Sequence, residues 1–556
     1  MKPYYLLLSL LVLCVNCNSE QQETEPTEGV SSVNAPFDWR NATVYFLLTD
    51  RFHNGKPNND VNFDRTREAA RLRGFQGGDI VGITRKIEEG YFDSLGVNAI
   101  WFTPVVEQIH GATDEGTGLT YAYHGYWAKD WTTLDPNFGT MEELKKLVDT
   151  AHEHGIRVLL DVVANHTGPV TETDPQWPDA WVRIDPACTY QGYETTVECT
   201  LVENLPDIHT GSLERVNLPP SLVKKWKDEG RYEQEIQELE EFFERTGYPK
   251  APKYYLIKWL TDYVRELGID GFRVDTAKHT EAELWAALKS QAMAALVGWK
   301  EKHAGLKLDD NPFWMVGEVY NYSAGSGQAY DYGDTLVNFY DHGFESLINF
   351  DFKYDAENDY ETIFSKYDSL LHLGPLQDVN ILNYLSSHDD GSPFDPLRQK
   401  SEEAANKLLL SQGAVQIYYG DESDRPLVIE GTEGDATLRS FMNWEAIAEN
   451  DSVQQVLRHW NKLGVFRKNH VAIGAGRHKQ LATQPYTFSR TFEQNNNTDK
   501  VVIALHNDTG KKEITVASVF EDDTPLRDYY SGQQLIVVNG KVSIDSPYQY
   551  VLLEKD

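Results

Sequence analysis

Short runs of apolar, β-branched and aromatic residues recur along the chain, and most are followed by a segment with helical periodicity. Residues 141–152 and 254–266 show the helical pattern clearly, with apolar residues at positions i, i+3, i+4 and i+7. Eight strands that alternate with helices predict an α/β fold, the (β/α)8 or TIM barrel. The strands expected are 44–48, 97–102, 157–163, 271–274, 313–317, 346–350, 381–385 and 415–418.

The spacing of these strands is uneven in one place. About 110 residues separate the third strand from the fourth, far more than one helix requires, which predicts an inserted domain at 167–253. Its charged segment 222–245 is expected to form one helix with a solvated face. After about residue 460, period-2 patterns predict a C-terminal antiparallel β-sandwich domain. The expected domains are the barrel (37–166 and 254–460), the insertion and the C-terminal domain (461–556).

The N-terminus has the pattern of an export signal. Residues 4–15 form an apolar run behind Lys2, too short for a comfortable membrane span, and no other stretch could span a bilayer. Residues 1–17 are therefore expected to be a signal peptide of the lipoprotein type, with lipidation at Cys17 and a disordered tether at 18–36. Plain cleavage and secretion is the alternative. Both place the protein outside the cytoplasm, in the periplasm or as an outer-membrane or cell-surface lipoprotein.

Charge and cysteine content narrow the function classes. A formal net charge of −35 argues against nucleic acid or an anionic membrane surface as partner, leaving an N-terminal lipid as the only expected membrane contact. A neutral polymer such as a glucan would not be repelled. Cys188 and Cys199 lie close together in the inserted domain and are expected to pair in an oxidising compartment; two free buried thiols are the alternative.

Polar residues follow five of the eight predicted strands. One aspartate at the end of a strand would be unremarkable, because aspartate is common in turns and caps. In a barrel, however, the carboxyl ends of the strands surround the active site, so the five sets together predict a common pocket. They are Asp50, the pair Asn165 and His166, the pair Arg273 and Asp275, Glu318, and the pair His388 and Asp389.

At these residues the chain resembles the α-amylase family of glycoside hydrolases, from about residue 38 onward. The family's short motifs occur in order: DVVANH (161–166), LPDI (205–208), GFRVDTAKH (271–279), VGEV (316–319) and SSHDD (386–390). Longer runs look most like the periplasmic bacterial α-amylases: LLTDRFHNGKPNND (47–60), AYHGYWAKDW (122–131) and GAVQIYYGDES (413–423).

The resemblance implies retaining hydrolysis, in which a carboxylate nucleophile and a carboxylic acid stand about 5 Å apart. It implies Asp275 as nucleophile, Glu318 as acid/base and Asp389 as the carboxylate that holds the distorted sugar. Arg273 lies two residues before Asp275 on one strand, so it points to the same side and would keep Asp275 ionised. For Asp161, a structural role at the barrel rim is as good a reading as sugar contact. The implied substrate-binding residues are His124, Tyr126, Asp161, His166, Arg273, Lys278, His279 and His388.

The resemblance also implies calcium as cofactor. A first site would use Asn165, Asp207 and the backbone carbonyl of His279, with Glu198 as a weaker fourth ligand. A second site would resemble the one in cyclodextrin-forming relatives, although Lys56 stands where those relatives carry an Asn ligand. An ordinary turn without metal is the alternative there. The residues implied for this second site are Asn54, Asn59, Asp60 and Asp79.

The function expected is therefore hydrolysis of α-1,4-glucosidic bonds in starch and maltodextrins by double displacement, carried out by a monomer. An α-glucosidase, a cyclodextrin-degrading enzyme or a transglycosylase of the same family is the nearest alternative, because loops around the subsites distinguish them. A non-catalytic glycan-binding protein on the same fold is a different class, and the intact set of three carboxyl groups argues against it.

Overall fold

The computed structural model describes residues 37–114, 116–494 and 497–556. The expected signal peptide, the lipidation residue Cys17 and the tether at 18–36 lie outside these ranges. In the part of the chain that is described, no helix has the length and apolar character needed to cross a membrane.

Eight parallel strands close into a barrel, and each overlaps one of the strands expected from the sequence, so the TIM barrel is confirmed. Their order around the barrel is β1-β16-β15-β14-β11-β10-β7-β2. Closure comes from pairing of β1 with both β2 and β16. The strands are β1 (Thr43–Leu47), β2 (Ala99–Phe102), β7 (Arg157–Val162), β10 (Gly271–Val274), β11 (Trp314–Gly317), β14 (Ser346–Asn349), β15 (Asn380–Tyr384) and β16 (Ala414–Tyr418).

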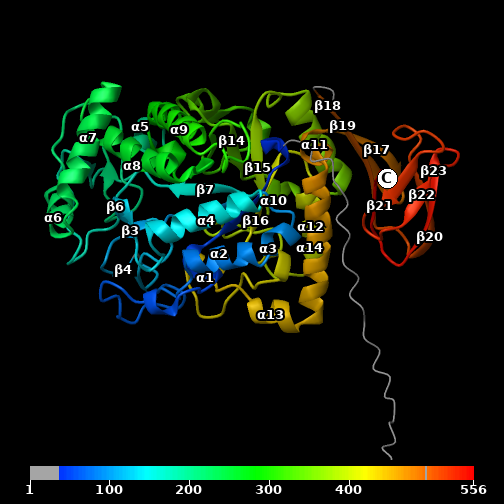
Figure 1. The fold of residues 1–556 in the computed structure, drawn as a ribbon, viewed down its shortest axis with the longest axis horizontal. Helices are drawn as coiled ribbons and strands as arrows, with labels where there is room; N and C mark the ends of the chain where they lie inside the picture. The colour runs from blue at the N-terminus through cyan, green and yellow to red at the C-terminus, as the bar shows by residue number, and fades with distance from the viewer. Residues whose placement is uncertain (1–36, 115, 495–496) are drawn as a thin grey trace, which may run out of the picture. The chain divides into compact units, whose positions relative to one another are not determined.

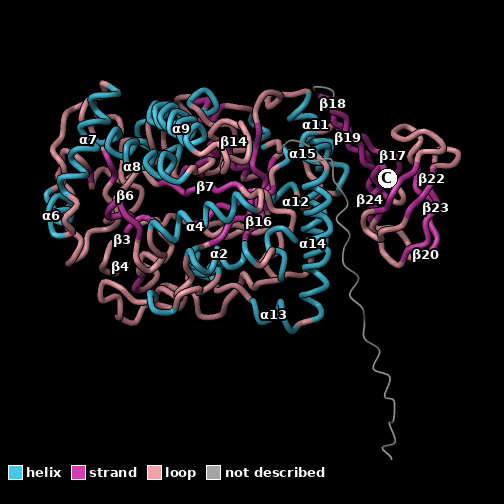
Figure 2. The backbone as a smooth tube through the Cα atoms, viewed as in Figure 1, coloured by secondary structure: helices cyan, strands magenta, loops and turns pink. Residues whose placement is uncertain are grey.

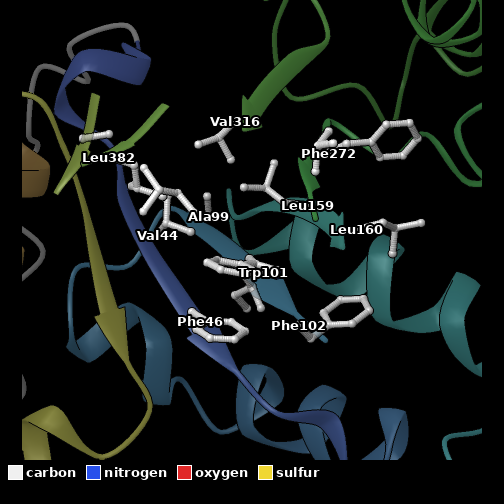
Figure 3. Close-up of a cluster of buried hydrophobic side chains, with 14 of the residues drawn as sticks. Val44, Phe46, Ala99, Trp101, Phe102, Leu159, Leu160, Phe272, Val316 and Leu382 are labelled. Carbon is white, nitrogen blue, oxygen red and sulfur yellow. The ribbon is translucent and has the colours of Figure 1, made fainter. Parts of the chain in front are cut away.

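The strands carry near-continuous apolar runs because helices cover the outside of the barrel while side chains fill its inside. Figure 3 shows part of the resulting core, in which Val44, Leu159, Val316 and Leu382 come from four different strands. Phe46 and Trp101 stack with ring centroids 3.7 Å apart. This aromatic pair forms part of the support beneath the polar residues that follow the strands.

Helices surround these strands in Figures 1 and 2. The helical patterns expected at 141–152 and 254–266 correspond to α4 and α8. Helix α4 begins at a capping box, in which Thr140 and Glu143 satisfy each other's backbone N–H groups. The principal helices of the barrel are α2 (Ile80–Glu88), α4 (Met141–Glu153), α8 (Pro252–Leu267), α9 (Ala282–Lys302), α11 (Tyr360–His372), α12 (Ser401–Leu409) and α14 (Asp451–Asn469). Shorter elements are α1 (Thr49–Phe52), α3 (Tyr91–Ser94), β3 (Val106–Gln108), β4 (Thr113–Asp114), β5 (Leu119–Thr120), β6 (Ala128–Leu134), β12 (Ala329–Asp331), β13 (Leu336–Asn338), α10 (Phe352–Asp355) and α13 (Trp444–Glu449).

The insertion between the third and fourth barrel strands is built mainly from small elements. The prediction of a single helix at 222–245 is wrong. The chain forms two helices separated at Gly230, whose φ of 74° is left-handed. The predicted disulfide is present between Cys188 and Cys199. The elements are β8 (Val182–Arg183), α5 (Glu194–Val197), β9 (Asp207–Ile208), α6 (Pro220–Asp228) and α7 (Tyr232–Thr246).

The C-terminal part of the chain is an antiparallel β structure with a core of its own (Figure 2). One sheet has the order β17-β18-β19-β24-β21-β22, and β20 pairs with β23. Helix α14 runs through residue 460, and α15 (Val471–Ala475) follows it, so the first C-terminal strand begins at Arg477. The strands are β17 (Arg477–Thr483), β18 (Tyr486–Gln494), β19 (Asn497–Leu505), β20 (Gly510–Thr515), β21 (Pro525–Asp528), β22 (Gln534–Ile536), β23 (Lys541–Ser546) and β24 (Val551–Lys555).

A histidine joins the last barrel helix to the C-terminal sheet. His470 follows α14, and its Nδ1 lies 2.9 Å from Asp499 of β19 while its Nε2 lies 2.6 Å from Glu554 of β24. Arg527 of β21 also pairs with Glu554. Burial opposes protonation of His470, but the bonds to both carboxylates outweigh it and raise its pKa to about 9. His470 is therefore an imidazolium held between two anions at neutral pH.

His470→Gln is expected to destabilise the C-terminal sheet by about 2 kcal/mol at pH 6, because two hydrogen bonds to charged partners are lost. The folded-state pKa is raised to about 9 from an ordinary value of 6.5, so this stabilisation is complete below pH 6.5 and is lost as the pH rises through 9. Guanidinium chloride unfolding at pH 6 and pH 10 measures the difference. His303→Gln, at an exposed helix end, is the control. An equal effect of His470→Gln at both pH values would contradict the charged state.

Candidate active site

Arg273 stands at the centre of a group of carboxylates at the carboxyl ends of the strands. Its Nη1 donates to Asp275 Oδ1 at 2.8 Å and to Asp161 Oδ1 at 2.9 Å. Its Nη2 lies 3.2 Å from Glu318 Oε2. The arginine is 1% exposed, so three carboxyl groups converge on one buried guanidinium.

The register of the barrel produces this arrangement. Arg273 of β10 pairs with Asp161 of β7, which places the two side chains next to each other. The backbone N–H of Asp275 donates to Val162 and that of Glu318 donates to Val274, so both residues extend the parallel ladders by one position. The sequence therefore positions these carboxyls through strand pairing rather than through flexible loops.

Glu318 is held in conditions that favour its protonated form. Burial raises its pKa well above the ordinary value, and the negative charges of Asp275 and Asp389 raise it further. The Arg273 charge and the N–H of Thr276, which donates to Glu318 Oε2 at 2.8 Å, act in the opposite direction. Burial likewise raises the pKa of Asp161, against the charge of Arg273.

Asp389 follows β15 and is more open than the other carboxyls, with its side chain 33% exposed. Burial raises its pKa, and the charges of Arg273 and Arg439 lower it. The ring of the preceding residue, His388, stacks on Tyr126 at 5.2 Å. Asp389 therefore lies where the buried cluster of charged groups meets solvent.

The polar aromatic residues expected at the pocket are close to the carboxyl groups. Tyr126 donates its hydroxyl to Asp161 Oδ2 at 2.8 Å. His124 Nδ1 accepts from the backbone N–H of Tyr126, which leaves Nε2 to carry the proton. Burial lowers the pKa of His124, His166 and His388, so these rings are neutral near pH 7.

Lys278 and His279 occupy the segment that follows Asp275. Lys278 Nζ donates to the carbonyl of Tyr320 at 3.0 Å and to the hydroxyl of Tyr330 at 3.2 Å. His279 Nδ1 lies 3.0 Å from the carbonyl of Thr196 in the insertion, and burial lowers its pKa to about 4. The ring of His279 therefore contacts the insertion, whereas burial lowers the pKa of Lys278 and the charge of nearby Glu318 raises it.

Three groups of the first expected metal set lie together. Asn165 Nδ2 donates to Asp207 Oδ1 at 2.6 Å and to the His279 carbonyl at 3.0 Å, and Asn165 Oδ1 lies 3.2 Å from His166 Nδ1. His166 Nε2 must donate to the Tyr126 carbonyl, so its neutral ring has an acceptor at Nδ1. A cation between Asp207 and the His279 carbonyl would favour the reverse orientation of the amide, with its nitrogen toward His166 and its oxygen toward the cation.

Three oxygens, from Asn165, Asp207 and the His279 carbonyl, would then face the ion, an arrangement that suits a hard cation. Burial raises the pKa of Asp207 to about 8, although Arg183 Nε lies 2.9 Å from its Oδ2, so this carboxyl lacks enough positive charge nearby to stay ionised at neutral pH. Glu198 is exposed, and its charge also raises the pKa of Asp207. In the described ranges, no group of three or more His, Cys, Asp or Glu side chains is arranged to hold a metal; this set has only one clear carboxylate.

The second expected metal set is held largely by donors. Asp79 caps α2, and its carboxylate accepts the backbone N–H groups of Gly82, Gly55 and Lys56. Asn54 Nδ2 donates to Asp60 Oδ1 at 3.0 Å. The side chain of Asn59 is buried and donates to the carbonyl of Asn137. These contacts give the turn a structural explanation, and a metal there stays a prediction.

Asp50 does not line the pocket, and three residues that were not predicted lie at or near the site. Asp50 is fully buried and accepts the backbone N–H groups of Gln76 and Gly77, so it supports a loop rather than the pocket. Trp101 Nε1 donates to Asp161 Oδ2 at 2.9 Å. Arg439 Nε donates to the carbonyl of His388 at 2.8 Å, and Arg439 also pairs with Asp435. The only sequence signal for that last pair is an acid and a base four residues apart.

The closed parallel barrel and the buried charged groups at the carboxyl ends of its strands define a TIM-barrel enzyme with its active site at that end. The family described as "Alpha amylase, catalytic domain" matches residues 46–465, more than half of the chain. The chain belongs to the alpha-amylase family of glycoside hydrolases.

Individual relatives agree with this assignment. The "Periplasmic alpha-amylase" of Escherichia coli (strain K12) is 37% identical over 530 residues, which cover 85% of this chain and 73% of that protein. A "Cyclomaltodextrin glucanotransferase" of Bacillus sp. (strain 6.6.3) is 28% identical over 81% of this chain, which spans 57% of that protein. The crystal structure of an Anoxybacillus alpha-amylase has a TM-score of 0.63 at 23% identity, covering 94% of this chain and 99% of that one, and it supports the fold.

Arg273→Gln is expected to raise the pKa of Glu318, because a nearby cation stabilises the ionised carboxylate and its removal favours the protonated form. Infrared difference titration measures the glutamate carboxyl band, with Glu318→Gln assigning it. Lys307→Gln, at a partly exposed lysine paired with a highly exposed aspartate, is the control. Titration of Glu318 at the same or lower pH in Arg273→Gln would contradict the arrangement.

Proposed function

We propose that this enzyme hydrolyses α-1,4-glucosidic bonds in starch and maltodextrins with retention of configuration. The observation that carries the proposal is the buried Arg273, which contacts Asp275 and lies 3.2 Å from Glu318. One guanidinium thus brings together an aspartate suited to be a nucleophile and a glutamic acid that burial keeps protonated. The similarity to a periplasmic alpha-amylase supports the substrate class and also supports export.

In the first step, the Asp275 carboxylate attacks the anomeric carbon while Glu318 donates its proton to the glycosidic oxygen. The bond to the leaving glucan breaks and a covalent glycosyl ester with Asp275 forms. In the second step, Glu318 removes a proton from water, the water oxygen attacks the same carbon, and Asp275 leaves. Asp389 binds hydroxyl groups of the distorted sugar, and the neutral rings of His124, His166 and His388 offer further hydrogen bonds.

The remaining site residues have supporting roles. Tyr126 provides a ring on which the sugar stacks, with its hydroxyl fixed by Asp161. Asp161 contacts Arg273, Trp101 and Tyr126, and we assign it to positioning rather than to sugar binding.

Transfer of the glycosyl unit to another sugar is the second candidate function. The cyclomaltodextrin glucanotransferase relatives favour it, since a sugar hydroxyl can replace water in the second step of the same mechanism. The products from maltoheptaose, cyclodextrin and soluble starch separate the candidates. Short maltooligosaccharides from starch support hydrolysis of internal bonds, glucose alone supports an α-glucosidase, and longer or cyclic products support transfer.

Asp275→Asn and Glu318→Gln are each expected to lower kcat on soluble starch by roughly 10⁴-fold, because a covalent step or its proton is lost. Release of reducing ends measures the rate. Asp310→Asn replaces a carboxylate that is 89% exposed and is the control, expected to match the wild type. Undiminished hydrolysis in Asp275→Asn would show that another group is the nucleophile.

We further propose calcium at Asn165, Asp207 and the His279 carbonyl, with Glu198 nearby. A cation there would neutralise the buried Asp207 and tie the insertion to the barrel, beside the segment that carries Lys278. It would supply structural support rather than a chemical step. The proximity of the Asn165 amide, the Asp207 carboxyl and the His279 carbonyl supports this proposal.

Chelation is expected to lower the melting temperature, and calcium but not magnesium should restore it, because the site offers several oxygens without the compact octahedron that magnesium requires. Scanning calorimetry with and without a chelator measures the change. In Asp207→Asn the chelator should have little further effect. The proposal fails if the chelated wild type melts unchanged and elemental analysis of the purified protein finds no calcium.

A further inference from the structure

A hairpin that follows the proposed acid Glu318 in the chain is held against Lys278. Strands β12 and β13 pair with each other in the segment between Glu318 and β14. Tyr330 of β12 accepts a hydrogen bond from Lys278 Nζ at 3.2 Å, and Tyr332 donates its hydroxyl to the Lys278 carbonyl at 2.7 Å. The hairpin therefore contacts Lys278 both at its side chain and at its backbone carbonyl.

Two tyrosine rings lie close to this ammonium group. Lys278 Nζ is 5.4 Å from the ring centroid of Tyr320 and 5.3 Å from that of Tyr330. Tyr320 is 39% exposed, and Tyr330 is half-buried. Burial raises the pKa of Tyr320, and the nearby charges of Asp389 and Glu318 raise it further, so this ring lies close to the proposed catalytic groups.

The chemistry of this cluster suits a sugar. Partly exposed rings offer apolar faces to the C–H side of a pyranose, and the ammonium and hydroxyl groups offer hydrogen bonds to its rim. A neutral glucan brings no charge that the acidic protein would repel. Tyr320 of this cluster lies two residues after Glu318, which protonates the leaving oxygen in the proposed mechanism.

The hairpin is also tied to the disulfide loop of the insertion. Asp334, in the turn between β12 and β13, accepts the backbone N–H of Tyr193 at 2.8 Å. A Cβ at Gly192 would lie 2.3 Å from Asp334 Oδ2, so a side chain there would displace the Asp334 carboxylate. The rings of Tyr193 and Tyr332 meet edge to face at 5.1 Å. Gly192 and Tyr193 both lie inside the loop that the Cys188–Cys199 disulfide closes.

We propose that the β12–β13 hairpin is a specificity element for the leaving glucan, in which Tyr330 binds a sugar ring beyond the cleaved bond. In this arrangement the Cys188–Cys199 loop is a positioning element that holds the hairpin through Asp334. The inference rests on the proposed glucan hydrolysis and adds to it the residues that select long leaving groups.

Two substrates test the binding role of Tyr330. Maltoheptaose can place several glucose units on the leaving side, whereas 4-nitrophenyl α-maltopentaoside cleaved at its aglycone places only one aromatic ring there. Tyr330→Ala is expected to lower kcat/KM for maltoheptaose by about five- to ten-fold, mainly through KM, as for the loss of one stacked ring. The fall for nitrophenol release should be several-fold smaller, and Tyr330→Phe should retain most of the preference.

The positioning role is tested through Asp334 and the disulfide. Asp334→Ala and the Cys188→Ser/Cys199→Ser pair should each shift the ratio of the two kcat/KM values in the direction of Tyr330→Ala. Combined, they should shift it no further than the larger single effect, because they break the same connection. Tyr548→Ala, at a 42% exposed ring of the C-terminal part, is the matched control.

Each outcome decides between alternatives. Equal losses on both substrates in Tyr330→Ala would show a structural residue and overturn the proposal, as would an unchanged ratio. Additive effects of Asp334→Ala and the cysteine pair would overturn the role of the loop. If the wild type cleaves neither substrate, the proposed glucan hydrolysis fails instead, and this result is distinct from the other outcomes.

Discussion

The active site depends on one buried positive charge. Removing Arg273 from water is costly, and only the surrounding carboxylates make it acceptable. The same charge keeps Asp161 from becoming an isolated buried acid and opposes the effect of burial on Glu318. Neither the guanidinium nor the carboxyl groups would be stable there alone, so the cluster is interdependent. This explains why a site with so much buried charge can rest on an apolar core.

The barrel makes this interdependence geometrically rigid. Asp161 and Arg273 are paired across two strands, and Asp275 and Glu318 extend the ladders of their own strands by one residue. A slip of one position in the register would turn alternate side chains to the other face of the sheet and disperse the cluster. Trp101 adds a further constraint, since its ring stacks on Phe46 while its Nε1 donates to Asp161. Core packing and the polar site are therefore connected through single side chains.

Much of the fold was predictable because buried parallel strands leave strong local signals. Runs such as 157–163 and 415–418 are short and largely apolar, and both correspond to strands of the barrel, β7 and β16. The helix expected at 222–245 failed because one glycine, Gly230, adopts a left-handed conformation that periodicity alone does not reveal. Helix α14 likewise continues past residue 460, because tertiary packing decides where a helix ends.

The residues of the candidate site could be predicted from the sequence more readily than the contacts between them. Strand ends and motifs identify Asp275, Glu318 and Asp389, but the approach of Arg439 to His388 joins residues far apart in sequence. The contact between Lys278 and Tyr330 could not be predicted for the same reason, because no residue near Tyr330 in the sequence indicates its hydrogen bond with Lys278. Long-range contacts of this kind depend on loop conformation, which composition and periodicity do not encode.

Closure of the barrel has a consequence for how the chain acquires its structure. Thr43 of β1 pairs with Val415 of β16, so the first strand lacks one neighbour until nearly the whole barrel sequence is available. Such distant pairing makes folding slow, because a long segment must be ordered before the contact forms. The catalytic pocket, which is built from the ends of strands all around the barrel, can therefore form only after the last barrel strand has been synthesised and paired.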